Sequence, residues 1–526
     1  MSNPVRKPIG QAWLLRDLGL AVPRPSVESY IVAGARRTES RGSRTIELYP
    51  KRYAPRDSVV AHLRFALRNE AFDLGVLIAA LREIEPPELE AWVRAQPTGA
   101  FSRRMWFLYE TFTGRTLDLE DASAGNYVGA LDPRRHVVAE RRNSRRHRVA
   151  DNLLGGPGLC PTVRLTPTLQ DAMNSGLDEE AHRLTAALSP SVLTRAVNYL
   201  YTKETRSSFA LEGETPDTRR ARRFVAALRG APGFDPADKR ALIRLHGAIV
   251  EPRYAEDDWR HVQNFVGETI GGHREFVHFV CPRPADVADL MRAWSDLTRR
   301  VIEGGVDPVV AAAVSSFAFV FIHPFEDGNG RIHRFLIHHV LAKRNYGPPG
   351  AILPVSAAIL RDQPAYDEAL AGFSEPLLDL IRWRWSTTSA DSPGREMIVT
   401  NETAHLYRYF DATALAEYLY DRLAASIRRD LKEELDFVAV LDRAFDAVRA
   451  IVTMPDRRAS LFVRLCLQND GRLAARKRRL FTELSDEEVT AMETAVRGAG
   501  RGIAVRGLEP MEGPAPSRCY RGLAPR

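Results

Sequence analysis

Residues 323–334 read HPFEDGNGRIHR, and this short stretch joins two segments that have the hydrophobic pattern of helices. The segment before it, 309–322, is almost entirely apolar and follows Asp307 and Pro308, a cap and first-turn pair typical of a helix start. The segment after it, 335–343, is amphipathic. The sequence therefore predicts a buried helix, a glycine-rich loop and a second helix.

The loop carries the residues that an anion site needs. Gly328 and Gly330 allow left-handed or tightly turned backbone, in which successive N–H groups converge on one point. The start of the second helix adds the positive end of its dipole at the same place. Arg331 and Arg334 are three residues apart on one helix face, so their guanidinium groups can bind further phosphates.

Two further side chains of this loop are reactive. Asp327 is a hard oxygen ligand beside the predicted phosphate cradle, which is the usual setting of protein-bound Mg²⁺. His323 can accept a proton from an attacking hydroxyl at physiological pH. Together these residues indicate a hydroxyl that attacks a magnesium-bound polyphosphate, with catalysis by positioning and charge stabilisation.

The stretch resembles the motif of the Fic family (filamentation induced by cyclic AMP), H-P-F-x-[D/E]-G-N-G-R-x-x-R, at every specified position. The resemblance implies an enzyme that transfers a nucleoside monophosphate, usually AMP from ATP, to a Ser, Thr or Tyr hydroxyl of a protein and releases pyrophosphate. It implies His323 as the general base and Asp327 as the Mg²⁺ ligand.

The same resemblance implies the nucleotide contacts. Gly328, Asn329 and Gly330 would form the anion hole around the α- and β-phosphates, Arg331 would bind the β-phosphate and Arg334 the γ-phosphate. In the related Doc kinase branch a lysine replaces the second glycine, so the glycine in this chain favours nucleotidyl transfer over phosphoryl transfer.

Other segments extend the resemblance. Residues 245–267 look like the first core segment of the family, and 271–280 lies where the family has a hairpin flap that aligns the target by strand addition. Gly271, Gly272 and Phe276 are the flap residues that this implies. Downstream, Tyr366 resembles one of a pair of tyrosines near the adenine pocket, although Ala365 precedes it here.

Upstream of the loop, Ser208, Glu212 and Gly213 resemble the inhibitory motif of the family, [S/T]-x-x-x-E-[G/N]. Ser208 and Glu212 are four residues apart and so share a helix face. The resemblance implies that Glu212 pairs with Arg334 and keeps that arginine from the γ-phosphate. Thr215 and the proline after it predict the start of the next helix.

The 526 residues favour several folding units, and the dominant period between the breaks is helical. We expect a mainly α fold: a Fic helical core with a small β-hairpin flap, flanked by additional helical domains. The expected divisions are a mostly helical N-terminal domain over 1–150, a linker over 151–170, a Fic domain over 171–385 with its inhibitory helix at about 200–213 and its catalytic loop at 323–334, a helical C-terminal domain over 395–506 and a flexible tail over 507–526.

The formal net charge of +7 leaves nucleic acid open as a partner. Two basic runs motivate that alternative: Arg134 to Arg148, and the group Arg472, Arg476, Lys477, Arg478 and Arg479. The competing interpretation is a solvated linker or helix face, since basic runs are common and unspecific.

Four cysteines, Cys160, Cys281, Cys466 and Cys519, are far apart and form no C-x-x-C pair, which favours reduced thiols and a cytoplasmic protein. The longest apolar run, 309–322, is shorter than the ~20 residues of a membrane span, so no membrane partner is expected.

The function predicted from these features is a self-inhibited protein adenylyltransferase that uses Mg²⁺ and ATP and modifies an unknown target protein or itself. Three alternatives stay open at this stage: removal of AMP, transfer of another nucleotide by the same site, and a nucleic-acid-binding regulator that carries a Fic module. Self-association into a homo-oligomer is also left open.

Overall fold

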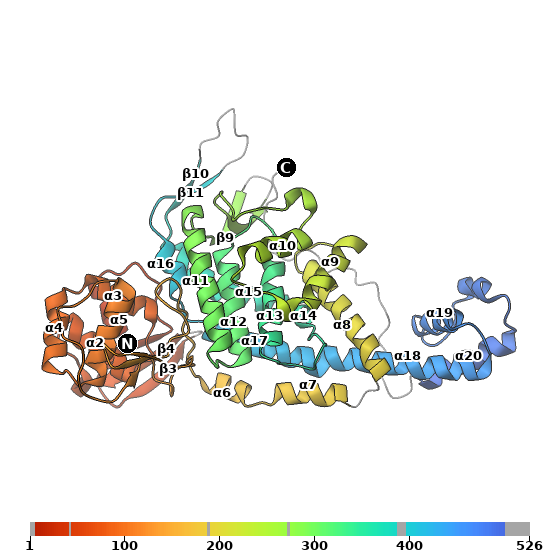
Figure 1. Ribbon diagram of the computed structural model, residues 1–526, viewed down its shortest axis with the longest axis horizontal. Helices are drawn as coiled ribbons and strands as arrows, with labels where there is room; N and C mark the ends of the chain where they lie inside the picture. The colour runs from red at the N-terminus through yellow and green to blue at the C-terminus, as the bar shows by residue number, and fades with distance from the viewer. Residues whose placement is uncertain (1–5, 42–43, 187–189, 271–273, 387–395, 500–526) are drawn as a thin grey trace, which may run out of the picture.

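The computed structural model describes residues 6–41, 44–186, 190–270, 274–386 and 396–499. The described chain is mainly helical, which confirms the predicted fold class, and its strands form small sheets. The molecule is elongated, with an N-terminal lobe at one end, a central helical core and a small helical module at the other end (Figure 1).

The N-terminal lobe contains a sheet as well as helices, so the prediction of a mostly helical domain over 1–150 is incomplete. The strand order is β1-β2-β4-β3, with β2 and β4 parallel. Strand β3 reads RTESR and β1 has three residues, so neither shows the apolar alternation that marks a strand in a sequence. The elements of the lobe are β1 (Lys7–Ile9), α1 (Gln11–Asp17), β2 (Val27–Val32), β3 (Arg37–Arg41), β4 (Arg44–Pro50), α2 (Val59–Asn69), α3 (Leu74–Glu83), α4 (Pro86–Ala95) and α5 (Ala100–Thr113).

The stretch 151–170 is packed into the molecule and is not the linker that its glycines and prolines predict. It follows a second small sheet of β5 (Val128–Gly129), β6 (Arg142–Ser144) and β7 (Val149–Asp151). Leu154, Cys160 and Val163 are fully buried. The Cys160 N–H also donates to the carbonyl of Arg408, 2.8 Å away, so this segment joins distant parts of the chain. The glycines and prolines of 151–170 form turns within a buried segment. Composition alone does not distinguish such a segment from an exposed linker.

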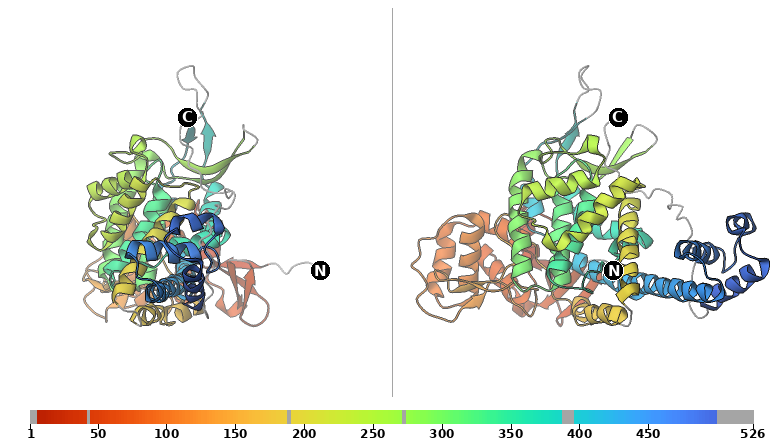
Figure 2. Two further views of the ribbon diagram at one scale, coloured as in Figure 1. Left: turned by 90° about the vertical axis from the view of Figure 1, so that its right-hand side faces the viewer. Right: turned by 45° about the vertical axis from the view of Figure 1, so that its right-hand side comes forward.

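Helix α12 (Pro308–Ile322) is the centre of the molecule, and all its residues from Val309 to Ile322 are buried. It starts where the sequence predicts, because the Asp307 carboxylate accepts from the N–H groups of Val309 and Val310 at 3.0 Å each. Helices α11 (Pro284–Glu303), α13 (Asn329–Lys343) and α17 (Thr413–Ala425) pack around it. Figure 2 shows the same arrangement from two other directions.

The remaining elements of the central core lie before α11 and after α13. They are α6 (Pro167–Met173), α7 (Leu177–Ala186), α8 (Pro190–Ala210), α9 (Thr218–Arg229), α10 (Lys239–Ile249), β8 (Phe265–Ile270), β9 (Arg274–Val280), α14 (Val355–Arg361), α15 (Gln363–Leu378), β10 (Trp383–Trp385), β11 (Met397–Val399) and α16 (Ala404–Arg408). Strands β8 and β9 pair antiparallel, as the predicted hairpin requires.

The predicted C-terminal domain over 395–506 has a different boundary in the structure. Leu415, Leu419 and Leu423 of α17 belong to the central core, whereas a separate hydrophobic core starts at Val440. Helix α17, a π-helical segment (Ser426–Leu431) and α18 (Lys432–Ile451) follow one another without a break and lead from one core to the other. Helices α19 (Asp456–Leu467) and α20 (Asp486–Ala499) complete the outer module. The predicted tail over 507–526 lies outside the described residues.

Among the described residues, none of the helices combines the length and the hydropathy that crossing a bilayer requires.

Candidate functional site

The predicted catalytic loop runs from the end of α12 to the start of α13 and is fixed by one asparagine. Asn329 accepts from the N–H of Phe325 at 3.1 Å and donates its Nδ2 to the Phe325 carbonyl at 2.8 Å. The Phe325 ring is fully buried and stacks on His246, with ring centroids 4.2 Å apart. The side chain of Asn329 therefore stabilises the conformation of the loop, and its backbone N–H remains available to bind an anion.

His323 ends helix α12 in the left-handed region, with φ 52°, and its N–H closes the helix on the Phe319 carbonyl at 3.0 Å. Its Nδ1 lies 3.1 Å from the Val320 carbonyl. Because a carbonyl only accepts, Nδ1 carries the proton and Nε2 presents a lone pair. Burial, followed by the nearby charge of Arg260, lowers the pKa of His323 to about 4, so the ring is neutral at pH 7.

The start of α13 forms a cradle of free N–H groups. Gly328 has φ 82° and its N–H binds the Asp327 carboxylate at 2.6 Å. In the part of the chain that the structure describes, the N–H groups of Asn329, Gly330 and Arg331 have no acceptor, as expected for the first turn of a helix. A side chain at Gly330 would collide with Glu212, since a Cβ there would lie 2.2 Å from Glu212 Oε1.

The structure brings the predicted inhibitory segment onto both arginines of the motif. Arg334 is buried and donates Nε to Ser208 Oγ at 2.9 Å, while its Nη2 meets the Ser208 carbonyl at 2.7 Å and Glu212 Oε1 at 2.8 Å. Arg331 donates Nη1 to Glu214 Oε2 at 3.0 Å and Nη2 to both oxygens of Asp327 at 3.0 and 3.1 Å.

The backbone at the end of α8 explains how Glu212 is aimed. Gly213 has φ 70°, its N–H binds the Ala210 carbonyl at 2.9 Å, and the Glu214 N–H binds the Phe209 carbonyl at 3.1 Å. This is the hydrogen-bond pattern of a Schellman cap, which needs a residue without a Cβ at that position. The next helix, α9, is capped by Asp217 and not by Thr215, because Asp217 accepts from the first N–H groups of α9.

Asp327 fits the role of a magnesium ligand in its chemistry and its exposure. Its side chain is 56% exposed, it lies at the rim of the amide cradle, and it is a hard oxygen donor. No group of three or more His, Cys, Asp or Glu that could hold a metal occurs among the described residues. Such a single carboxylate beside a phosphate site suits Mg²⁺, which keeps waters and takes phosphate oxygens as its other ligands.

The predicted flap is partly described. Strands β8 and β9 pair with a bulge between Val266 and Gly267, and a Cβ at Gly267 would lie 2.4 Å from the Phe276 carbonyl. Phe276 itself is 55% exposed. Gly271 and Gly272 lie outside the described residues.

Tyr366 is buried on α15 beside the Arg334 guanidinium. Its ring lies 6.1 Å from the rings of both His333 and Tyr418, and burial raises the pKa of its hydroxyl. The structure thus places Tyr366 next to Arg334, the arginine for which the family resemblance implies a γ-phosphate contact.

Two residues of the site were not assigned from the sequence. Glu214 follows the inhibitory motif by one residue and could have been found as a second carboxylate on the same segment. Arg260 binds the backbone of the catalytic loop from 63 positions away, and no local pattern indicates that contact.

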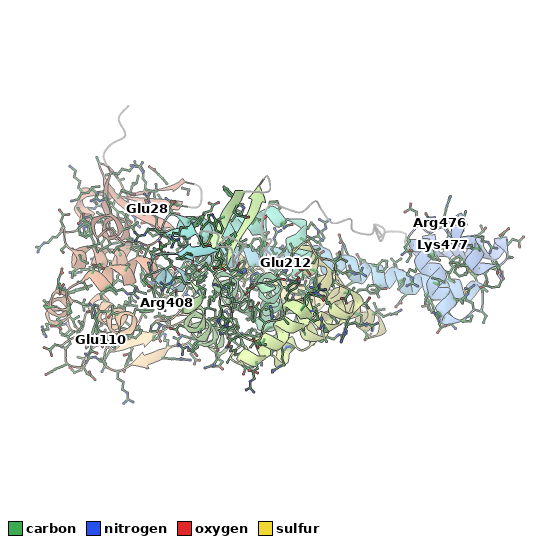
Figure 3. The ribbon with its side chains drawn as sticks, turned by 90° about the horizontal axis from the view of Figure 1, so that it is seen from above. Glu28, Glu110, Glu212, Arg408, Arg476 and Lys477 are labelled. Atoms are coloured by element: carbon green, nitrogen blue, oxygen red, sulfur yellow. The ribbon has the colours of Figure 1, made fainter. Side chains whose placement is uncertain are left out.

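Both basic runs make contacts within their own part of the molecule; in the C-terminal one, Arg478 binds the Leu484 carbonyl at 2.6 Å and the Asp486 carboxylate at 2.9 Å. In the first, Arg146 binds the Glu110 carboxylate at 2.8 Å, Arg135 the Glu70 carbonyl at 2.9 Å and Arg148 the Gly125 carbonyl at 2.7 Å, so these cations stabilise the N-terminal lobe. In the second, Arg476 and Lys477 lie in the outer module, at the opposite end of the molecule from Glu110, with Glu212 between them (Figure 3).

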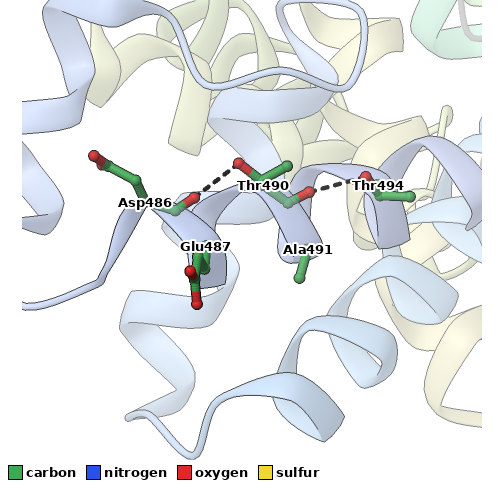
Figure 4. A pocket seen from close by; sticks show the side chains of 5 residues that line it. All are labelled: Asp486, Glu487, Thr490, Ala491 and Thr494. Atoms are coloured by element: carbon green, nitrogen blue, oxygen red, sulfur yellow. Dashed lines mark hydrogen bonds between the residues drawn. The ribbon is translucent and has the colours of Figure 1, made fainter.

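The outer module also has a shallow surface depression on α20, lined by Asp486, Glu487, Thr490, Ala491 and Thr494 (Figure 4). Its threonine hydroxyls donate to carbonyls of their own helix, Thr490 to Asp486 at 2.8 Å and Thr494 to Thr490 at 2.9 Å. The hydroxyl protons of both threonines are therefore used within the helix.

Comparison with known proteins agrees with this geometry. The model of the Fic/DOC family matches residues 236–341, which include the hairpin, α12, the catalytic loop and most of α13, and this part of the chain is a Fic domain.

The chain is similar to proteins named "Protein adenylyltransferase Fic". It is 26% identical over 281 residues to the one from Drosophila willistoni, covering 46% of this chain and 53% of that protein. It is 25% identical over 235 residues to the one from Nematostella vectensis, covering 40% and 55%. The chain thus spans about half the length of the curated relatives it matches.

Among solved structures, a Fic family protein from Desulfovibrio desulfuricans G20 matches 56% of this chain and 84% of its own, with 22% identity and a TM-score of 0.38.

Proposed function

We propose that this chain is a self-inhibited protein adenylyltransferase, which transfers AMP from ATP to a Ser, Thr or Tyr hydroxyl of a target protein or of itself. The observation that carries the proposal is the position of His323, a neutral imidazole whose Nε2 presents a lone pair. It lies next to the N-terminus of α13, where the backbone N–H groups can bind an anion. The names of the curated relatives support the same activity.

In the proposed reaction, the hydroxyl oxygen attacks the α-phosphorus of ATP and its proton passes to His323 Nε2. A phosphorus–oxygen bond to the target forms, the bond to the bridging oxygen of the β-phosphate breaks, and pyrophosphate leaves. The N–H groups of Asn329 and Gly330 and the two motif arginines stabilise the charge on the phosphates. Mg²⁺, held by Asp327, would neutralise charge on the phosphate oxygens.

The inhibitory segment supports a resting state in which ATP binds poorly. Glu212 occupies Arg334 and covers Gly330, and Glu214 occupies Arg331, so two carboxylates stand where triphosphate oxygens would bind. A buried Arg–carboxylate pair can contribute a few kcal/mol, which corresponds to about a hundredfold in occupancy. The segment must therefore withdraw before a productive ATP complex forms.

The target would bind along the exposed hairpin. An extended segment can add to the free edge of a two-stranded sheet through main-chain hydrogen bonds, which places its hydroxyl by register.

The buried, unpaired thiols of Cys160, Cys281 and Cys466 support action in a reducing compartment, the cytoplasm.

The test is a labelling assay on the purified chain with ATP and Mg²⁺, read by intact mass for the addition of one AMP. It compares wild type, Glu212→Gly, and Glu212→Gly combined with His323→Ala. We expect labelling of Glu212→Gly alone. A cell lysate added to the Glu212→Gly variant supplies external targets, and competition by GTP, CTP and UTP tests the choice of nucleotide. Labelling that survives the loss of His323 would contradict the proposed base.

A further inference from the structure

Arg260 is a buried guanidinium, 2% exposed, whose acceptors are backbone carbonyls. Its Nε donates to the His323 carbonyl at 2.7 Å, Nη1 to the Val262 carbonyl at 2.8 Å and Nη2 to the Pro282 carbonyl at 2.6 Å. The backbone N–H of Arg260 donates to the Pro324 carbonyl at 2.9 Å. Among the described residues Arg260 forms no direct ion pair, and the carboxylates of Glu256 and Glu326 act on it from a longer distance.

A buried cation without a counter-ion is costly, so its location needs a physical reason. Arg260 lies at the C-terminus of α12, where the last carbonyls of the helix have no partner within the helix. The negative end of the helix dipole stabilises a cation there. The helix end and the more distant carboxylates of Glu256 and Glu326 therefore offset part of the cost of burying this charge.

The same guanidinium joins the hairpin to the catalytic loop. Val262 lies just before β8 and Pro282 just after β9, so Arg260 binds both chain ends at the open side of the hairpin. Asn264 adds a second link from the same segment, because its Nδ2 donates to the Glu326 carbonyl at 3.0 Å. These hydrogen bonds connect the base of the hairpin directly to the end of α12 and to the catalytic loop.

Arg260 also acts on His323 through its charge. Two charged groups face the His323 imidazole: Arg260, which disfavours the protonated ring, and Asp327, which favours it. Burial is the larger cause of the lowered pKa and the Arg260 charge is the next. Both effects keep the ring neutral, which is the form that accepts a proton.

We propose that Arg260 is the positioning residue of the general base: it holds the backbone of His323 at the end of α12 and fixes it to the base of the target-binding hairpin. Its positive charge beside the ring also favours the neutral imidazole. This inference rests on the proposed transferase activity for its consequence and on the contacts of Arg260 for its physical basis. The role requires both the fork of carbonyl bonds and the positive charge, so the two can be separated by substitution.

The first measurement is made without activity. Histidine C2-hydrogen exchange, read by mass spectrometry on the full chain as a function of pH, reports the pKa of His323 in wild type, Arg260→Met and Arg260→Lys. We expect the pKa of His323 to rise by about one unit in Arg260→Met, where the like charge is removed, and to stay low in Arg260→Lys. Arg103→Met is the matched control, because Arg103 in the N-terminal lobe is also 2% exposed and donates to backbone carbonyls, those of Arg148 at 3.0 Å and Asn126 at 2.9 Å.

The second measurement uses the same substitutions in the Glu212→Gly background. We expect Arg260→Lys to lower the AMP-transfer rate at least tenfold, with an ATP dissociation constant within about threefold of the parent, since the charge stays and the carbonyl fork is lost. Arg260→Met should lower the rate further and move the acid limb of its pH profile upward. Circular dichroism and thermal unfolding identify any variant that does not fold.

The outcomes are separable. An unchanged pKa of His323 in a folded Arg260→Met variant overturns the electrostatic part of the proposal, and an unchanged transfer rate in Arg260→Lys overturns the positioning part. If Arg260→Met does not fold, the Arg260→Lys rate decides. If the Glu212→Gly parent transfers no AMP, the proposed function fails, and the exchange measurement still decides whether Arg260 controls His323.

Discussion

The Glu212 carboxylate lies 2.8 Å from Arg334 Nη2 and at the same time stands over Gly330, where a Cβ would come within 2.2 Å of Glu212 Oε1. One side chain therefore covers both an arginine and the amide N-terminus of α13. An anion that enters this cradle has to displace it, which makes the competition between carboxylate and phosphate a matter of direct exclusion.

Replacing Glu212 by glycine should raise the affinity for ATP and the rate of AMP labelling by about 10- to 100-fold, because Arg334 is released and the cradle is uncovered. Isothermal titration with ATP and Mg²⁺ measures the first effect and intact mass the second. Glu487→Gly, at an exposed glutamate of the outer module, is the control. Equal ATP affinity in Glu212→Gly and wild type would show that the contact does not inhibit.

Glu214→Gln should have a smaller effect of the same sign, about 3- to 10-fold in ATP affinity, because Arg331 keeps its contact with Asp327 when Glu214 is neutralised. Arg220→Gln is the matched control, since Arg220 binds the same Glu214 oxygen at 2.7 Å from the other side. The same titration applies. A tighter complex in Arg220→Gln than in Glu214→Gln would assign the effect to the loop conformation and not to Arg331.

The pH profile of transfer should be flat with respect to His323 between pH 6 and 8 and fall on the acid side with a midpoint near 4, since burial and Arg260 lower the pKa of His323 to about 4. The sign follows from the role: protonation removes the lone pair that accepts the hydroxyl proton. His323→Ala should lose at least 100-fold in rate with ATP binding retained. A midpoint above 6 in the Glu212→Gly parent contradicts the buried, neutral base.

Asp327→Ala should abolish the stimulation of transfer by Mg²⁺, because the carboxylate contributes one hard ligand to the metal. Metal-free ATP binding should be retained or strengthened, because the same substitution releases Arg331 from its contact with Asp327. Titrating Mg²⁺ against the labelling rate in Asp327→Ala and its parent measures this. Glu326→Ala, at the exposed neighbour, is the control. Stimulation by Mg²⁺ that persists in Asp327→Ala would place the metal elsewhere.

Asp430→Ala should lower the free energy of unfolding by about 3 kcal/mol, because Asp430 is fully buried and its loss leaves Lys203 of α8 and Arg361 without their shared partner. Urea unfolding followed by circular dichroism measures it. Glu433→Ala, which breaks an exposed pair with Arg429, should change it by less than about 0.5 kcal/mol. Equal effects of the two substitutions would mean that the buried pair contributes no more than a surface pair.

Much of the local geometry of the candidate site could be predicted from the sequence because its parts are neighbours in the chain. The cap at Asp307, the buried helix behind it, the two glycines of the loop and the spacing of Arg331 and Arg334 all act within a few residues of one another. Such features depend on local backbone geometry, which the order of residues determines directly.

The contact between Glu212 and Arg334 spans 122 positions, yet it was anticipated from a family motif that records it. The motifs used in the sequence analysis did not anticipate the contacts of Arg260. Its three carbonyl acceptors belong to segments up to 63 positions away, and no periodicity in the sequence indicates which buried carbonyls will converge on one guanidinium.

The boundaries of the flanking regions also depend on contacts between distant segments, which the sequence pattern does not indicate. The sequence alone determined a mainly helical chain with a glycine-rich loop after a buried helix, because helix caps, apolar periodicity and glycine conformations are properties of short segments. Only the tertiary structure decided that 151–170 is buried, that α17 belongs to the central core, and that Glu214 and Arg260 reach the catalytic loop. These facts depend on which distant surfaces exclude water from one another, and that is a property of the folded chain as a whole.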